Sequence, residues 1–353
     1  MERQEAAFDL RSAEADQAES APVFPNQPCR IAVVIPCFRG GDTVEKVIRG
    51  IGPAVGRIYL VDDLCPDDSG ARIAERVADP RLKVFRNEAN LGVGGAMKRG
   101  YAEALREGAQ VIVKLDADGQ MDPAFISFLA EPLLAGQADY AKGNRFAPRH
   151  RMPSGDGSAR PMPSIRRVGN NLLSFVHKAV TGQWHVIDPA NGYTAIHRRA
   201  LESIDLAAVA DCYFFETDML FQLNLVDAVV QDVPLPAHYA GEVSSLKLRR
   251  VFSRFSGLAL HRFVKRIWVR YFVDDFNVAS LELILALPLL LLGSAFGFLR
   301  WREAVETGVA SSAGTVMFAA LPIIIGFQLL LSAISYDVSR RPAAPISRQA
   351  AEA

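Results

Sequence analysis

Two long apolar spans near the C-terminus constrain the fold of this chain more than any other feature. Residues 278–299 and 313–334 each hold 22 residues, so each would be roughly 33 Å long as a helix, which matches the hydrocarbon core of a bilayer. The second span carries no charge, and the first carries only Glu282, one turn from its start. The proline in each span would break a water-soluble helix but is tolerated in a membrane. Buried core helices are the alternative, and two spans of full length favour a transmembrane hairpin over residues 278–335.

The charges around these spans predict how the chain meets a membrane. Residues 247–270 hold eight Lys or Arg and no acid, interleaved with apolar residues, which indicates a basic amphipathic segment on an anionic membrane surface, over 241–277. A nucleic-acid-binding helix is the competing interpretation, which the following spans and the formal net charge of zero disfavour. Because Arg340 and Arg341 follow the second span, the positive-inside rule places both ends in the cytosol. We expect a multi-pass protein of the inner (cell) membrane with a cytoplasmic tail over 336–353.

The N-terminal part predicts an α/β domain. Residues 1–28 are rich in Glu, Ala, Gln, Asp and Pro and lack a signal-type apolar core, so we expect a disordered tail. The chain then alternates short apolar runs with segments of helical spacing, at 31–35, 43–50, 57–61, 71–78, 82–85, 92–107 and 111–115. This alternation predicts parallel βαβ units and a doubly wound sheet in a cytoplasmic domain over 29–240.

Two acidic clusters follow predicted strands. Asp62 and Asp63 end one strand, and Asp116, Asp118 and Gln120 follow another. Right-handed crossovers put the carboxyl ends of parallel strands on one edge of the sheet, where α/β proteins bind ligands. Two carboxylates one residue apart suit a hard divalent ion shared with substrate phosphates. The pattern predicts a metal-held diphosphate, with a solvated acidic turn as the alternative.

Basic and acidic residues beyond these clusters suggest further parts of a site. Arg145 ends a predicted strand over 139–146, and arginine suits a bidentate grip on phosphate. The stretch 147–164 has no periodicity, which is typical of functional lids or disordered loops. Glu216 and Asp218 open a helix, where they either compensate the helix dipole or serve the site.

A cytosolic metal–diphosphate site on a membrane-anchored chain suggests a soluble activated donor and a lipid-borne acceptor. Sugar transfer from a nucleotide sugar to a polyprenyl phosphate has these properties, with the metal neutralising the leaving diphosphate. A phosphate acceptor needs no strong base, and Arg145 and Lys247 would supply countercharge. The alternative acceptor is a polysaccharide or glycolipid hydroxyl, for which Asp218 would have to act as base. A membrane-anchored scaffold without turnover is the third hypothesis.

Several motifs together resemble family 2 glycosyltransferases of the dolichol-phosphate mannose synthase type, over about residues 30–335. They are 33–36 (VVIP), 62–63 (DD), 90–94 (NLGVG), 116–120 (DADGQ), 142–146 (KGNRF), 191–193 (NGY) and 244–247 (SSLK). Many members carry glycine where this chain has Leu64. The resemblance implies a GT-A (Rossmann-like) fold, an inverting single displacement and Mg²⁺ or Mn²⁺ as cofactor. GDP-mannose, UDP-glucose and UDP-N-acetylglucosamine all fit as donors, with dolichyl or undecaprenyl phosphate as acceptor and a homo-oligomer left open.

The resemblance also implies roles for individual residues. Asp118 and Gln120 would hold the metal, and Asp118 and Arg145 would carry the catalysis, with Arg145 meeting phosphate. The remaining positions divide between the donor and the acceptor: Pro36, Asp63 and Asp116 would bind the nucleoside part of the donor, and Ser244, Ser245 and Lys247 would lie near the acceptor or the mobile edge of the site.

Overall fold

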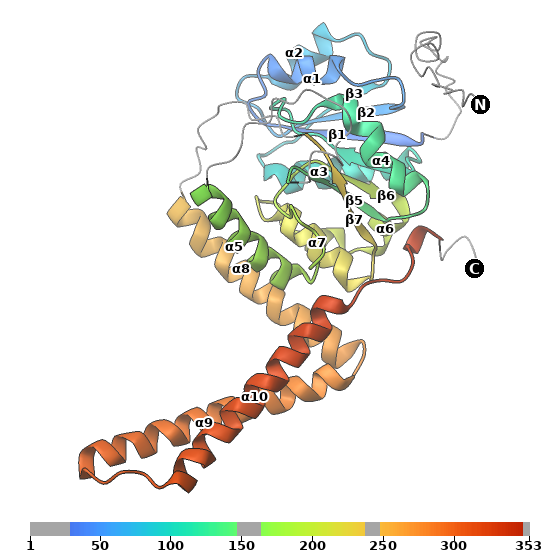
Figure 1. Ribbon diagram of the computed structural model, residues 1–353. Helices are drawn as coiled ribbons and strands as arrows, with labels where there is room; N and C mark the ends of the chain where they lie inside the picture. Colours follow the sequence, from blue (N-terminus) through green and yellow to red (C-terminus); the bar gives the residue numbers. More distant parts are fainter. Residues whose placement is uncertain (1–28, 147–163, 237–247, 349–353) are drawn as a thin grey trace, which may run out of the picture.

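Figure 1 shows the computed structural model of the chain, which describes residues 29–146, 164–236 and 248–348. The N-terminal tail, almost all of the long loop after Arg145, and Ser244, Ser245 and Lys247 lie outside the described residues. The predictions made for them therefore stay predictions.

A seven-stranded sheet forms the centre of the α/β domain, in the order β3-β2-β1-β4-β6-β5-β7. The β6 strand runs antiparallel to both of its neighbours, and the other pairs are parallel. The predicted doubly wound, mostly parallel sheet is thereby confirmed. The strands are β1 (Ile31–Cys37), β2 (Arg57–Asp62), β3 (Leu82–Arg86), β4 (Val111–Lys114), β5 (Tyr140–Asn144), β6 (Thr194–His197) and β7 (Val230–Pro234).

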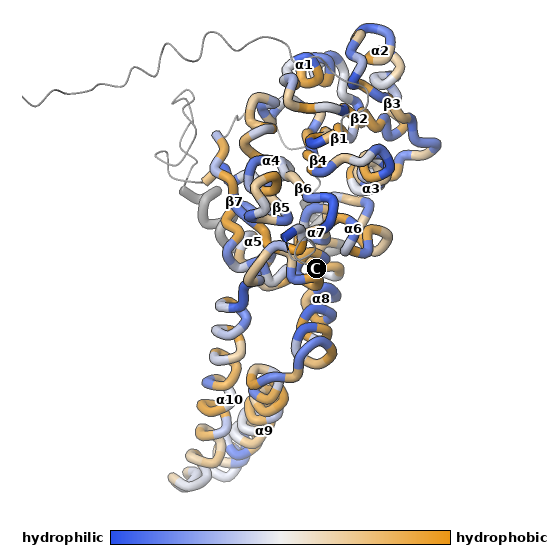
Figure 2. The backbone as a smooth tube through the Cα atoms, turned by 90° about the vertical axis from the view of Figure 1, so that its right-hand side faces the viewer, coloured by the Kyte–Doolittle hydropathy of each residue, from blue (hydrophilic) through white to orange (hydrophobic). Residues whose placement is uncertain are grey.

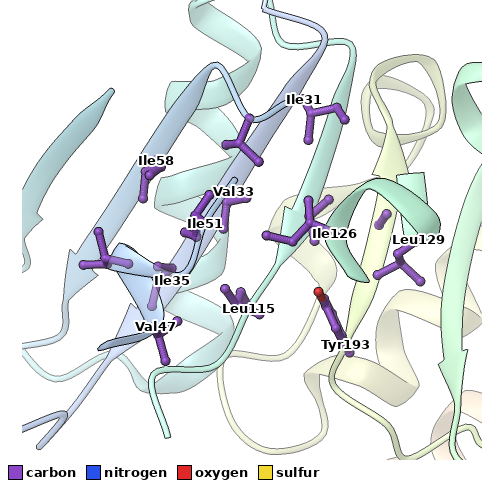
Figure 3. Packing of buried hydrophobic residues seen from close by; sticks show 14 of the residues in the cluster. Ile31, Val33, Ile35, Val47, Ile51, Ile58, Leu115, Ile126, Leu129 and Tyr193 are labelled. Atoms are coloured by element: carbon purple, nitrogen blue, oxygen red, sulfur yellow. The ribbon is translucent and has the colours of Figure 1, made fainter. Parts of the chain in front are cut away.

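Helices cover both faces of this sheet, which explains why its central strands read as continuous apolar runs. In β1, Ile31, Val33 and Ile35 pack with α1 and α4 on one face, as Figure 3 shows, while Ala32 and Val34 pack with α3 and α7 on the other. The helices of the domain are α1 (Thr43–Arg49), α2 (Ser69–Arg76), α3 (Gly92–Arg106), α4 (Ile126–Leu134), α5 (Ser164–Thr181), α6 (Arg198–Ser203) and α7 (Phe215–Leu225).

The turns at the carboxyl edge of the sheet need unusual backbone conformations. Gly119, in the turn after β4, has φ +75°, where a side chain would be strained. Leu64, in the loop after β2, also has a positive φ, of 57°. Leu64 thus adopts a conformation that glycine adopts without strain.

Two long helices follow the domain and project from it side by side (Figure 1). They are α9 (Val278–Thr307) and α10 (Ala313–Ser339), and both are long and apolar enough to cross a membrane. In Figure 2, where the backbone is coloured by residue hydropathy, hydrophobic residues predominate along both helices. Gly293 permits their close contact, because a Cβ there would lie 2.9 Å from the Ile323 side chain. The two predicted apolar spans lie within these longer helices.

The segment predicted to lie on the membrane forms α8 (Leu248–Trp268) and turns three of its cations inward. Arg262 and Arg266 lie four residues apart on one face of α8, and Arg270 lies in the π-helical turn that follows, Val269–Val273. Each of the three pairs with an acid of the domain or of α10. Leu260 and Trp268 are exposed. These three arginines pair inside the protein, so they do not contribute to a cationic surface toward lipid. The membrane-lying role of the segment stays a prediction.

Candidate active site

An open pocket of about 190 Å³ lies at the carboxyl edge of the sheet. Its lining brings together four of the predicted site residues, from the turn after β4 and the end of β5: Asp116, Asp118, Gln120 and Arg145. The turn before β6 closes another side of the pocket with Asn191, Gly192 and Tyr193. Residues distant in sequence thus meet where the strand ends predict a ligand site.

Asp116 is held by a buried lysine. The Nζ atom of Lys114 lies 2.7 Å from Asp116 Oδ1 and 3.1 Å from Glu216 Oε1, and Lys114 is 1% exposed. Burial alone would lower the pKa of Lys114, but the two carboxylates outweigh it and raise the pKa. Asp116 is therefore fixed and charge-compensated, which suits a donor contact better than a full metal ligand. Sequence reasoning missed Lys114, whose only signal is a cation at the end of a buried strand.

Asp118 and Gln120 occupy the exposed part of the same turn. The backbone N–H of Gln120 donates to Asp118 Oδ1 at 2.9 Å, which fixes the carboxylate beside the pocket. Within the described residues no three His, Cys, Asp or Glu side chains form a metal cluster. One carboxylate and one amide oxygen do fit Mg²⁺ or Mn²⁺, because such ions usually complete their shell with water and substrate phosphate.

Arg145 is clamped by a buried acid. Its Nε donates to Asp188 Oδ2 at 2.7 Å and its Nη2 donates to Asp188 Oδ1 at 3.1 Å, while Asp188 is 2% exposed. This two-point contact fixes the plane of the guanidinium at the pocket wall. The sequence gives no local signal for this clamp, because Asp188 lies 43 residues beyond Arg145.

The Asn-Gly-Tyr turn ties the pocket walls together. Asn191 Nδ2 donates to the carbonyl of Gly143 at 2.6 Å, and Lys142 Nζ donates to the carbonyl of Asn191 at 2.6 Å. Burial lowers the pKa of Lys142 to about 8, against the opposing effect of nearby carboxylates. A Cβ at Gly192 would lie 2.8 Å from Lys114 Nζ, so only glycine fits there without displacement.

The acidic pair after β2 is used differently. Asp63 is 3% exposed, and its carboxylate accepts hydrogen bonds from Asn87 Nδ2 at 2.8 Å and from the backbone N–H groups of Leu91 and Gly92 at 2.9 and 2.7 Å. It thereby holds the start of α3. Neither Asp63 nor Pro36 lines the pocket, and their nucleoside-binding role stays a prediction.

The hypothesis that Asp218 acts as a base is wrong for this structure. Asp218 is fully buried, and both of its oxygens accept from Arg262, at 2.7 and 2.9 Å. Oδ2 also accepts from the backbone N–H of Ala210. The carboxylate joins α7 to α8 and does not line the pocket. Glu216, two residues earlier in α7, instead supports the site through Lys114.

Comparison with known proteins identifies a family and relatives of this chain. Residues 32–205 match the family model described as Glycosyl transferase family 2. Polyprenol monophosphomannose synthase of Mycolicibacterium smegmatis is 32% identical over 222 residues, which cover 62% of this chain and 80% of the relative. Undecaprenyl-phosphate mannosyltransferase of Micrococcus luteus is 28% identical, over 58% of this chain and 82% of the relative. Glucosyl-3-phosphoglycerate synthase of Mycobacterium tuberculosis, solved with UDP, aligns with a TM-score of 0.48 and 21% identity, over 67% of this chain and 80% of that one.

Proposed function

The chain belongs to glycosyl transferase family 2, and we propose that it moves a sugar from a nucleotide sugar to the phosphate of a membrane polyprenyl phosphate. One observation carries the proposal: a single pocket joins Asp118 and Gln120 to Arg145 in a chain that ends in two helices of membrane length. Relatives named for polyprenol monophosphomannose synthesis and undecaprenyl-phosphate mannosyl transfer support the lipid acceptor.

The turn after β4 binds the donor in this proposal. Asp118 and Gln120 would hold Mg²⁺ or Mn²⁺, which when bound neutralises the departing nucleoside diphosphate. Asp116 contacts the nucleoside or sugar, and Lys114 compensates its charge and fixes its rotamer. A phosphate oxygen of the acceptor forms a bond to the anomeric carbon as the bond from that carbon to the diphosphate breaks, which inverts the configuration.

Arg145 and the residues around it would bind the acceptor phosphate. A phosphate monoester is largely ionised near neutral pH, so the site must supply countercharge more than a base. Arg145, fixed by Asp188, is placed to supply it. A second, smaller hollow of about 60 Å³ begins at Arg145. The exposed apolar side chains of Leu173 and Ile187 beside it would offer a surface for the first isoprene units of a prenyl chain.

The membrane completes the proposal. The helices α9 and α10 would span the inner (cell) membrane, and the α/β domain would lie in the cytoplasm with its donor. Exposed apolar side chains on α5 and α8, including Phe175 and Trp268, would face the lipid, so that the acceptor phosphate reaches Arg145 without leaving the membrane surface.

A transfer assay on the full chain in lipid tests this function. GDP-mannose, UDP-glucose and UDP-N-acetylglucosamine are each offered with undecaprenyl phosphate and Mg²⁺ or Mn²⁺, and the glycolipid is identified by mass spectrometry. We expect one donor to yield product, EDTA to stop the reaction, and Asp118→Ala to abolish it while folding is kept. Asp211→Ala removes an exposed acid that pairs with Lys98 outside the pocket and is the matched control. Undiminished transfer by Asp118→Ala would overturn the proposal.

A further inference from the structure

The carboxylate of Asp337, near the end of α10, collects donors from three parts of the chain. It accepts from Arg266 Nη1 at 2.6 Å and Nη2 at 3.0 Å, from the Tyr271 hydroxyl at 2.6 Å, and from Trp184 Nε1 at 2.6 Å. Its side chain is only 12% exposed. Four donors use the full acceptor capacity of one carboxylate. The end of the second long helix is therefore fixed to α8 and to the α/β domain.

The contact with Trp184 leads directly to the pocket. Trp184 belongs to the loop 182–189, and four residues later the same loop carries Asp188, which clamps Arg145. The loop is also anchored to the sheet: Val186 is fully buried in the core, the N–H of Ile187 donates to Asp232 Oδ2 at 2.8 Å, and His185 Nε2 contacts the carbonyl of Val230 at 2.8 Å. One short loop thus connects the end of α10 to the arginine at the pocket wall.

A second contact of the C-terminal part involves β5, the strand that leads to Arg145. After α10 the chain returns to the domain (Figure 1), where the N–H groups of Ile346 and Ser347 donate to Asp139 at 2.9 and 3.1 Å. Asp139 is fully buried directly before β5, the strand that ends one residue before Arg145. The C-terminal part thus contacts the start of this strand directly, and it reaches Arg145 beyond the other end through Trp184 and Asp188.

We propose that Asp337 and Trp184 are positioning residues that couple the long C-terminal helices to the pocket. Asp337 fixes the loop 182–189 through the Trp184 indole, so that Asp188 holds Arg145 where an acceptor phosphate arrives. The role assigned to Arg145 rests on the proposed function, whereas the mechanical coupling rests on the contacts alone.

Kinetics of two variants test the coupling. Trp184→Phe removes one N–H donor and keeps an aromatic ring, and Asp337→Asn keeps the shape and removes the charge. In the transfer assay we expect kcat for undecaprenyl phosphate to fall about tenfold, the scale on which outer-shell partners of site residues act, while KM for the nucleotide sugar stays within about twofold. Trp301→Phe and Glu306→Gln, at the exposed far end of α9, are the matched controls and should behave as wild type.

Hydrogen–deuterium exchange supplies a readout without activity. In Asp337→Asn, peptides covering 182–189 and the Arg145 amide should exchange about tenfold faster, while β1 and β2 keep their protection. Faster exchange in the loop with an unchanged Arg145 amide would overturn the coupling, as would unchanged exchange in both. Trp184→Phe gives the same test if Asp337→Asn does not fold. If wild type transfers sugar to no lipid phosphate, the proposed function fails while the exchange result still decides the coupling.

Discussion

Two acidic strand ends, similar in sequence, serve opposite purposes in this fold. After β2, Asp62 and Asp63 are 1% and 3% exposed, and every carboxylate oxygen accepts from an N–H group. After β4, Asp118 is exposed at the pocket and Asp116 is held by Lys114. The first pair organises loops, and the second faces a ligand.

The difference arises from the backbone around each pair. Two helices, α2 and α3, begin beside Asp62 and Asp63, and helix starts offer N–H groups without intrahelical partners. In the turn after β4 the N–H of Gln120 donates to Asp118, and the carboxylate lies at the pocket lining. A carboxylate becomes structural where several N–H groups of helix starts converge on it in a buried place, whereas the Asp118 carboxylate stays at the exposed pocket.

Removing Asp62 should give the largest loss of stability. Asp62→Ala leaves the N–H groups of Cys65 and Gly70, which donate to it at 2.7 and 2.9 Å, without partners in a buried place. At about 1–3 kcal/mol for each unpaired group, the free energy of unfolding should fall by about 3–4 kcal/mol. Denaturant unfolding measures this. A fall in the free energy of unfolding below about 1 kcal/mol would show that Asp62 is not structural, and the contrast with the strand end after β4 would be lost.

Asp232, in β7, lies between these two cases, because it is partly buried but only one of its carboxylate oxygens is hydrogen-bonded in the described structure. The pH dependence of stability tests its role. Its Oδ1 lacks a hydrogen-bond partner in the described structure, and burial raises its pKa to about 6. Because the folded pKa exceeds the usual value of about 3.9, its contribution to stability is complete below pH 4 and is lost as pH rises through 6. Asp232→Asn should therefore raise the free energy of unfolding at pH 8 by about 2 kcal/mol, and little at pH 4. An equal change at both pH values would contradict this.

A substitution at Gly192 tests whether Asp116, in the turn after β4, contacts the donor. In Gly192→Ala the new Cβ would approach Lys114 Nζ and Asp116 Oδ2 to 2.8 and 2.9 Å, so the carboxylate must shift. We expect KM for the nucleotide sugar to rise about tenfold, or about 1.4 kcal/mol, with a melting temperature close to that of wild type. Gly52→Ala, where a Cβ meets nothing within 4 Å, is the control. An unchanged KM would show that Asp116 does not contact the donor.

Leu64 should give the smallest effect. Leu64→Gly relieves a left-handed residue, worth about 1–2 kcal/mol, but adds backbone entropy to the unfolded chain, worth about 0.5–1 kcal/mol. The net gain in unfolding free energy should be about 0.5 kcal/mol. A clear destabilisation in thermal melting would mean that the Leu64 side chain, although 41% exposed, makes contacts that outweigh its strain.

The sequence contains the local patterns of this molecule but not its long-range pairings. The apolar runs predict β1 and β4. The motifs at these strand ends depend on short spacings, so the sequence alone indicates family 2 glycosyltransferases, and the comparisons confirm this family. Lys114 and Glu216 pair across about a hundred residues, and such partners leave no local period. The spacing of Arg262, Arg266 and Arg270 predicts a shared helix face. The acids that pair with these arginines lie on α10 and in the α/β domain. No pattern within residues 248–273 reveals these partners.

Binding of Mn²⁺ with a nucleoside diphosphate tests the central claim most directly, because it needs no knowledge of the sugar or the acceptor. Titrations followed by electron paramagnetic resonance use Mn²⁺ with GDP and with UDP on wild type, Asp118→Asn, Asp62→Asn and Asp211→Asn. The account predicts that Asp118→Asn weakens Mn²⁺ binding about 100-fold, while folded Asp62→Asn and Asp211→Asn bind it as wild type does. Full binding by Asp118→Asn together with loss in Asp62→Asn would contradict it and move the metal to the other strand end.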